Sequence, residues 1–422
     1  MIPNGRLAET FALLTATLLL VFFRPRGISE GVWAALGAAL CLLLGLSTPR
    51  DALALVLSAK DALLFLLALL ALSTLLEESG FFAWAAGACA RFARGNGHLL
   101  YLLLFGLGAV TSALLSLDTT AVILTPVVLA AVRRSGVPAR PYVVATAFVA
   151  NAGSLSFPIS NLTNLLLAEH FNQGFLPFAV RMALPEAVAL AVTFAALRLW
   201  FRAELPARFE GAGHPAPPRH PFFFRTALGV LGFVFAGYLV GPRFHLPPYV
   251  FAFAGSAVLA VTGAVTAGLG VRWVRRLSLG VFPFVMGLLV LVDALHAQWG
   301  HDGASALLAR WAASPTLAPY VAALSAAVAS NVVNNLPTAL FAEHALGASP
   351  SPALIYGTLL GTNLGPNATV FGSLATLLVL DQARRAGEPT RGRDLVALGL
   401  LSTPIVLFAS AAALQLTLRL VH

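Results

Sequence analysis

Long apolar runs, separated by short polar or basic stretches, make up most of this chain. A helix needs about 20 residues to cross a bilayer, and the runs near that length are 8–23, 29–48, 61–77, 99–132, 142–167, 175–200, 223–240, 249–270, 278–296, 317–346, 353–380 and 395–418. Two weaker amphipathic stretches, 81–92 and 304–313, predict helices at the membrane interface. The pattern predicts an all-α polytopic membrane protein.

Polar clusters inside these runs recur in the second half of the chain. The matched pairs are Asp118 and Asn331 at an offset of 213, and Asn151 and Asn363, Gly153 and Gly365, Leu162 and Leu374, and Leu165 and Leu377 at an offset of 212. This constant spacing indicates an internal duplication. Interrupted hydrophobic segments at matching positions of two halves point to the midplane binding site of a secondary transporter.

Each copy holds five spans and one long run with a polar centre, which either crosses twice or re-enters. Because five is odd, the second copy must be inverted relative to the first. We therefore predict about 10 transmembrane helices plus two re-entrant hairpins, arranged as an inverted repeat of two halves. The predicted units are a first inverted repeat at 1–201 with a hairpin at 99–133 and a broken helix at 142–167, a cytoplasmic linker at 202–221, and a second repeat at 222–422 with a hairpin at 317–346 and a broken helix at 353–380.

The arginines set the orientation. If the first hairpin re-enters, both of its flanks share one face with the linker and the other basic loops. These residues are Arg24, Arg26, Arg91, Arg94, His98, Arg133, Arg134, Arg140, Arg202, Arg208, Arg219, Arg225, Arg272, Arg275, Arg276, Arg384, Arg385, Arg391 and Arg393. The positive-inside rule predicts that this face is cytoplasmic. The protein then lies in the cell (inner) membrane with both termini on the extracytoplasmic side.

Composition agrees with this class. Hydrophobic residues make up 59% of the chain and charged residues 10%, against roughly 25% charged residues in a soluble domain. The net charge of +9 comes from arginines between apolar runs, so it orients the chain and does not indicate a nucleic-acid partner. The sequence has no Walker motif, dinucleotide fingerprint or nucleophile elbow. We expect no enzyme, cofactor or metal site, and Cys41 and Cys89 lie too deep in apolar runs to suggest a disulfide.

The candidate substrate site consists of hydroxyl and amide side chains at the hairpin tips and helix breaks. Glycine and proline interrupt the two broken helices in mid-span, and the free helix ends would aim partial charges into a shared cavity. The side chains expected to bind substrate are Ser116, Thr119, Thr120, Asn151, Ser160, Asn161, Thr163, Asn164, Ser330, Asn331, Asn334, Asn335, Asn363, Asn367, Thr369, Ser373 and Thr376. Polar residues can also simply join helices through hydrogen bonds.

Asp118 is the expected ion-coupling residue. A carboxylate in the membrane interior costs on the order of 3 kcal/mol on insertion scales and is by default a functional group. Burial favours its protonated form, so it can exchange a proton or hold a sodium ion. Its repeat mate Asn331 carries no charge, so the two halves are not equivalent in coupling.

The remaining ionisable residues carry weaker expectations. Glu77 and Glu78 end a span and are expected to be solvated, and Asp293 lies late in a span of the second copy. Glu186 follows a proline inside a span, where an ion pair with Arg181 is expected. The histidines lie near predicted helix ends without a metal-ligand spacing; they are His170, His296, His301 and His344.

Four of these polar stretches resemble the arsenite/antimonite efflux permeases, the arsenical pump membrane proteins of the ion transporter superfamily. They are residues 116–126 (SLDTTAVILTP), 160–166 (SNLTNLL), 330–338 (SNVVNNLPT) and 361–378 (GTNLGPNATVFGSLATLL). The resemblance implies export of arsenite or antimonite in exchange for protons by elevator-type alternating access. It implies a scaffold domain and a moving transport domain that holds both hairpins. It also implies a possible soluble ATPase subunit and a possible homodimer.

Other substrates suit the same kind of site. A dicarboxylate would also bind between opposed helix N-termini, so a sodium-coupled dicarboxylate or anion symporter is the alternative, and a sodium/proton antiporter using Asp118 alone is another. A passive channel is a further possibility, although interrupted inverted repeats suit alternating access better. Arsenous acid is small, polyhydroxylated and mainly uncharged at neutral pH, which suits a site of hydroxyls and amides.

Overall fold

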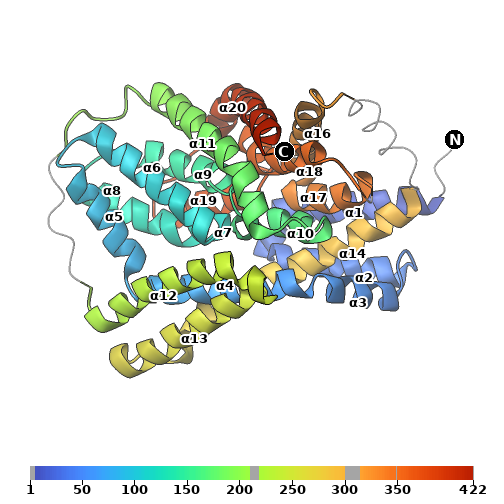
Figure 1. Ribbon diagram of the computed structural model, residues 1–422, viewed down its shortest axis with the longest axis horizontal. Coiled ribbons are helices and arrows are strands. Elements are labelled where there is room, and N and C mark those ends of the chain that lie inside the picture. Colours follow the sequence, from blue (N-terminus) through green and yellow to red (C-terminus); the bar gives the residue numbers. More distant parts are fainter. Residues whose placement is uncertain (1–4, 210–217, 300–313, 348, 422) are drawn as a thin grey trace.

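The structure is a computed structural model that describes residues 5–209, 218–299, 314–347 and 349–421. Helices form the regular elements of these residues (Figure 1), and the isolated bridge between Asn96 and Arg208 is the one extended pairing among them. The predicted all-α fold is confirmed. Of the two predicted amphipathic stretches, 81–92 is a helix, and 304–313 lies outside the described residues.

The helices follow the apolar runs in order. In the first half they are α1 (Gly5–Phe23), η1 (Pro25–Gly27), α2 (Glu30–Leu43), α3 (Pro49–Ser58), α4 (Lys60–Glu78), α5 (Phe81–Phe92), α6 (Gly97–Leu114), α7 (Leu117–Thr119), η2 (Thr120–Leu124), α8 (Thr125–Arg134), α9 (Ala139–Ala152), η3 (Pro158–Ser160), α10 (Leu162–His170) and α11 (Phe175–Trp200). In the second half they are α12 (Pro221–Val240), η4 (Gly241–Phe244), α13 (Pro248–Ala267), η5 (Val271–Arg276), α14 (Val281–Trp299), α16 (Ala318–Val333), α17 (Asn335–Ala345), α18 (Pro352–Leu364), η6 (Gly365–Ala368), α19 (Leu374–Arg385) and α20 (Gly392–Leu420).

Many of these helices are suited to a bilayer. Among the described residues seven are long and apolar enough to cross, or up to eight when α3 and α4, which bend by 58°, count as one span. The halves of the two broken helices, α9 with α10 and α18 with α19, are each too short to cross alone. The protein is thus a multi-pass membrane protein, and the figure of ten spans stays a prediction.

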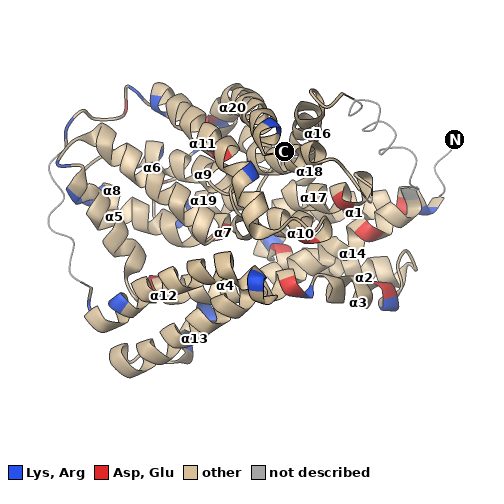
Figure 2. Cartoon of the chain, in the orientation of Figure 1, with Lys and Arg blue, Asp and Glu red and all other residues tan. Residues whose placement is uncertain are grey.

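The helices lie in two layers (Figure 1). The hairpin layer contains α6–α11 and α16–α20, and the flanking layer contains α1–α4 and α12–α14. The layers meet mainly where α14 packs on α17, with smaller contacts of α4 on α10 and η2. Charged residues are sparse along both layers (Figure 2), as expected for surfaces that face lipid.

Helices of the two halves pair reciprocally. In the flanking layer α2 packs on α14 and α4 packs on α13, while in the hairpin layer α10 packs on α17, α19 packs on η2 and α8, and α11 packs on α20. At the repeat offset α2 corresponds to α13 and α4 corresponds to α14. The contact of α2 with α14 is therefore matched by the contact of α13 with α4. Two copies related by a two-fold axis give this exchange of partners, which supports the predicted duplication; the boundaries of the two repeats stay predictions.

The matched glycines stand where a hairpin crosses a broken helix. A Cβ on Gly153 would lie 2.9 Å from the Cα of Ala109 on α6, and one on Gly365 would lie 2.5 Å from the Cα of Ala327 on α16. Only a glycine lets two backbones approach this closely. The first helix of each hairpin, α6 or α16, therefore packs directly against the interruption of the broken helix in the same half.

Both flanks of the first hairpin contact the linker. Asn96, before α6, bridges to Arg208, and Arg140, after α8, pairs with Glu204 at 2.9 Å. Arg140 also pairs with Asp394 at 3.2 Å. The segment between them therefore returns to the side from which it came, and the loops before α6, after α8 and before α20 lie at one face with the linker.

Candidate functional site

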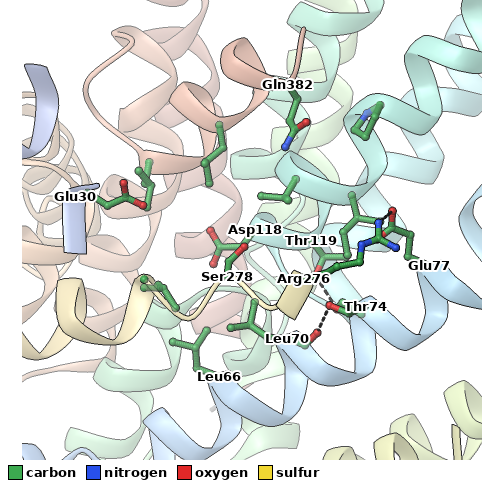
Figure 3. Close-up of a pocket in the computed structure, with 18 residues that line it drawn as sticks. Glu30, Leu66, Leu70, Thr74, Glu77, Asp118, Thr119, Arg276, Ser278 and Gln382 are labelled. Atoms are coloured by element: carbon green, nitrogen blue, oxygen red, sulfur yellow. Dashed lines mark hydrogen bonds and ion pairs between the residues drawn. The ribbon is translucent and has the colours of Figure 1, made fainter. Parts of the chain in front are cut away.

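The tip of the first hairpin opens onto a cavity of about 550 Å³. Asp118 and Thr119 line it from the tip, and α4 forms the facing wall (Figure 3). The polar side chains around this cavity are Glu30, Ser73, Thr74, Glu77, Asp118, Thr119, Arg276, Ser278 and Gln382, and Leu374 and Leu378 of α19 line it too. Residues from both halves of the chain and from both layers therefore meet at one cavity.

The hydroxyl groups at the tip of the first hairpin make hydrogen bonds within the protein. The Ser116 hydroxyl caps α7 by accepting the backbone N–H of Thr119 at 3.1 Å. Thr119 Oγ1 also lies 2.8 Å from Ser73 Oγ of α4, and Thr120 Oγ1 lies 2.8 Å from Ser112 Oγ. These bonds fix the turn and join it to the flanking layer.

Asp118 is different from its neighbours. Within the described residues, its carboxylate makes no hydrogen bond and no ion pair, and it is partly exposed to the cavity. The cation that lines the same cavity, Arg276, pairs instead with Glu77 at 2.7 Å and with Glu78. Buried charges are ordinarily paired, so this carboxylate is a candidate for binding a ligand or a proton in the cavity.

The amides of the two broken helices bind one another. Asn151 Nδ2 donates to Asn367 Oδ1 at 2.9 Å, Asn161 Nδ2 donates to Asn363 Oδ1 at 2.8 Å, and Asn363 Nδ2 donates to Asn164 Oδ1 at 2.7 Å. We call these five residues the amide network. All five are buried and none lines the cavity. The network joins the break of one copy to the break of the other.

The tip of the second hairpin is bound to the break before α19. Asn334 Nδ2 donates to the carbonyl of Phe371 at 3.2 Å, and the backbone N–H of Asn335 donates to the carbonyl of Gly372 at 3.0 Å. Asn331 accepts from Thr369 Oγ1 at 2.7 Å. The second tip binds the segment before α19, and α19 itself lines the cavity of Asp118. This helix therefore connects the second tip to the cavity at the first.

The side chains of three of the other predicted residues have hydrogen-bond partners within the protein, and those of two have none among the described residues. Ser160 Oγ donates to the carbonyl of Ala113, Ser373 caps α19, and Thr376 Oγ1 accepts from Asn151 at 3.4 Å. The hydroxyls of Thr163 and Ser330 are buried without a hydrogen-bond partner. Of the predicted set, Asp118 and Thr119 line the cavity, and the rest build the tips and breaks around it.

Sequence alone did not identify the residues of α4, and of the segment around Arg276, that face Asp118 across the cavity. Ser73 and Thr74 are a polar pair in the middle of the otherwise apolar α4, which is a signal that could have found them. Glu77, expected to be a solvated helix end, lines the cavity together with Arg276. Arg276 and Ser278 carry no local signal, because only the tertiary fold brings the segment after η5 under the hairpin tip.

The expected ion pair between Arg181 and Glu186 is wrong. The Glu186 carboxylate accepts the backbone N–H of Ser156, which the interruption after α9 leaves without a helical partner. Arg181 donates to Tyr356 Oη at 3.4 Å. Residues five apart do not face each other on a helix, in contrast to residues three or four apart, so each side chain finds its partner on another element.

Comparison with known proteins gives a consistent result. Residues 8–412 match the family described as arsenical pump membrane protein. The arsenical pump membrane protein of Escherichia coli K12 is 32% identical over 428 residues, covering 96% of this chain and 98% of that protein. A putative arsenical pump membrane protein of Bacillus subtilis is 24% identical over 436 residues, covering 93% and 96%.

A solved structure shares the fold. The YdaH transporter of Alcanivorax borkumensis, whose crystal structure is described as having an unusual topology, aligns with a TM-score of 0.57 and 17% identity over 85% of each chain. At this identity the likeness concerns the fold alone. The family match over nearly the whole chain establishes a membrane transporter, and the protein belongs to the arsenical pump membrane protein family.

Proposed function

We propose that this protein exports trivalent arsenic or antimony hydroxide in exchange for protons. The observation that carries the proposal is the Asp118 carboxylate, which faces a cavity between the two layers and has no hydrogen bond or ion pair with any residue that the structure describes. Arsenous acid is small, uncharged and rich in hydroxyls, and the cavity offers hydroxyls from Ser73, Thr74 and Ser278. The family membership supports an arsenical as the substrate.

The proposed mechanism is an elevator. The hairpin layer carries both tips, both breaks and Asp118, and it would slide against the flanking layer while substrate or a proton occupies the cavity. The narrow contact between the layers, mainly α14 on α17, supports such a movement. The cavity lies beside Arg276, in a basic stretch of the predicted cytoplasmic face, so we assign this conformation to the inward-facing state.

Asp118→Asn tests the coupling role. The substitution keeps the size of the side chain and removes its exchangeable proton, so we expect normal insertion and loss of proton-driven arsenite flux to background. The measurement is arsenite uptake into everted membrane vesicles with and without an uncoupler. Asp381→Asn is the matched control, because Asp381 pairs with Arg385 at 2.8 Å outside the cavity and should leave uptake unchanged.

The same vesicles select between substrates. Arsenite, antimonite and succinate are compared with and without a sodium gradient. Arsenite accumulation that the uncoupler abolishes supports the proposal, and sodium-dependent succinate uptake would select the anion symporter instead. The ATPase subunit and the homodimer implied by the family resemblance are proposals that co-purification and mass measurement test.

A further inference from the structure

A second group of titratable side chains lies where α10, α14 and α17 meet. Two pairs approach within charge-pairing distance: His170 Nδ1 and Glu343 Oε2 at 3.9 Å, and His344 Nε2 and Asp293 Oδ1 at 3.9 Å. The imidazole of His296 stacks on that of His344 with ring centroids 4.1 Å apart. The cluster consists of Glu169, His170, Asp293, His296, Glu343 and His344, and we call it the histidine cluster.

The histidine cluster and the Asp118 cavity lie at opposite ends of the same two helices. Gly280 and Val281, at the start of α14, line the cavity, whereas Asp293 and His296 lie 12 and 15 residues after Val281. At 1.5 Å per residue this separation is about 20 Å. Likewise Glu77, at the end of α4, lines the cavity, and Asp61, at its start, interacts electrostatically with Glu169. The cluster therefore lies toward the face opposite the basic loops.

One of the two pairs crosses between the layers. Asp293 and His296 belong to α14 of the flanking layer, whereas His344 belongs to α17, the second arm of the second hairpin. The pair of His170 and Glu343 lies within the hairpin layer. The contact of His344 with Asp293 is therefore the one that sliding of the hairpin layer would break.

The surroundings of His344 determine which nitrogen binds a proton. His344 Nδ1 lies 3.1 Å from the carbonyl oxygen of Leu340, which can only accept, so Nδ1 carries the hydrogen of the neutral ring. Nε2 is then the atom that gains a proton, and it faces Asp293. The side chains of His344 and Asp293 are 27% and 33% exposed, so water can reach both.

Among the described residues, the other helices packed on α17 and α10 add few charges. α16 and α18 contribute Tyr320 and Tyr356, which are hydrogen-bonded to Gln415 and Gln173. Arg181 of α11 donates to Tyr356, and α4 contributes Asp61. In the part of the chain that the structure describes, the carboxylate that faces Nε2 of His344 is therefore that of Asp293.

We propose that His344 binds a proton where α17 of the hairpin layer contacts α14 of the flanking layer. Protonation from the face opposite the basic loops stabilises the conformation in which the cavity of Asp118 is open to the basic face. The inference rests on the proposed function. The imidazolium attracts Asp293 and holds α17 against α14, and release of the proton leaves Asp293 without its counter-charge. A low pH on the extracytoplasmic side then favours the return of the arsenite-free protein to the conformation that is open to the basic face. A proton-driven exporter requires this step.

The test varies the pH of the vesicle lumen, which corresponds to the extracytoplasmic side, at constant pH outside. Histidine is the side chain whose charge ordinarily changes between about pH 5 and 8, so wild-type arsenite uptake should rise several-fold as the lumen is acidified. In His344→Gln this dependence should shrink to less than half of the wild-type fold-change. Asp293→Asn should reduce it in the same direction, because it removes the partner of the imidazolium.

His245→Gln is the matched control. His245 is exposed in the loop after α12, on the same predicted side and outside the histidine cluster, so its luminal pH profile should equal that of the wild type. A structural role of His344 alone would lower uptake equally at every pH, and wild-type profiles in His344→Gln and Asp293→Asn would likewise overturn the inference. Absence of arsenite uptake by the wild-type protein would instead reject the proposed function.

Discussion

At the scale of single residues, Asn363 is the centre of the amide network. Its Oδ1 accepts from Ser154 Oγ and Asn161 Nδ2, and its Nδ2 donates to Asn164 Oδ1. A buried amide with all its groups satisfied holds three elements in one arrangement, since each alternative leaves polar atoms unpaired in an apolar environment.

Asn363→Ala should destabilise the protein strongly. It leaves the amides of Asn161 and Asn164 each short of a buried partner, at about 1–3 kcal/mol for an unsatisfied group, so we expect a loss of about 3 kcal/mol. Thermal unfolding in detergent measures this loss. Thr226→Ala is the control, because the half-buried Thr226 hydroxyl donates to the carbonyl of Phe222 in its own helix. An equal melting temperature for the two variants would contradict the role of the network.

Single residues were predictable from sequence where their chemistry is unusual for a membrane. Asp118 stands out as a lone acid in an apolar run and indeed faces the cavity. The amides were identified as a group, but hydrogen bonding among themselves cannot be distinguished from substrate binding before their partners are known. Arg276 carried no signal, because its position under the hairpin tip depends on contacts between distant segments.

At the scale of elements, the close crossing of α16 over η6 depends on Gly365. The backbone there is in the ordinary right-handed region, with φ of −50°, so the glycine is required by space and not by its dihedral angles. Glycine and proline in mid-span made both breaks predictable from sequence. Which helix fills each break was not predictable, since the sequence does not specify which neighbour approaches.

Gly365→Ala should separate the second hairpin from its broken helix. The new Cβ would lie 2.5 Å from Ala327 Cα, and overpacking of this kind costs roughly 1–3 kcal/mol. Gly106→Ala is the matched control, because nothing lies within 4 Å of a Cβ at this helical position, and alanine there should stabilise by about 0.5–1 kcal/mol. Melting temperatures that change equally in the two variants would refute the steric explanation.

At the scale of the whole molecule, the hairpin layer and the flanking layer touch at the cavity through Ser73 and Thr119. Their hydroxyl oxygens lie 2.8 Å apart, so this contact reports whether the layers move relative to each other. A division into a scaffold domain and a transport domain was expected from the family resemblance, and the pattern of spans alone did not predict it. The line along which the layers meet could not be predicted either, since it depends on how α4 and α14 pack.

A disulfide across this contact should stop transport. In a protein with alanine at the free cysteines Cys41 and Cys89, Ser73→Cys with Thr119→Cys should lose arsenite uptake on oxidation and regain it on reduction. Each single cysteine variant should be insensitive to the oxidant. Uptake that persists after complete cross-linking, judged by mass spectrometry, would exclude sliding of the layers.

The chemistry of the amide network has a consequence for robustness. Neutral amides neither gain nor lose protons under physiological conditions, and dissolved salt hardly screens them, so the joint between the two broken helices has the same strength in acid or alkaline surroundings. An ionisable contact, the pair of His344 and Asp293, lies instead between the hairpin layer and the flanking layer. If the proposed elevator mechanism holds, sudden acidity would change the movement of the hairpin layer without weakening the amide network.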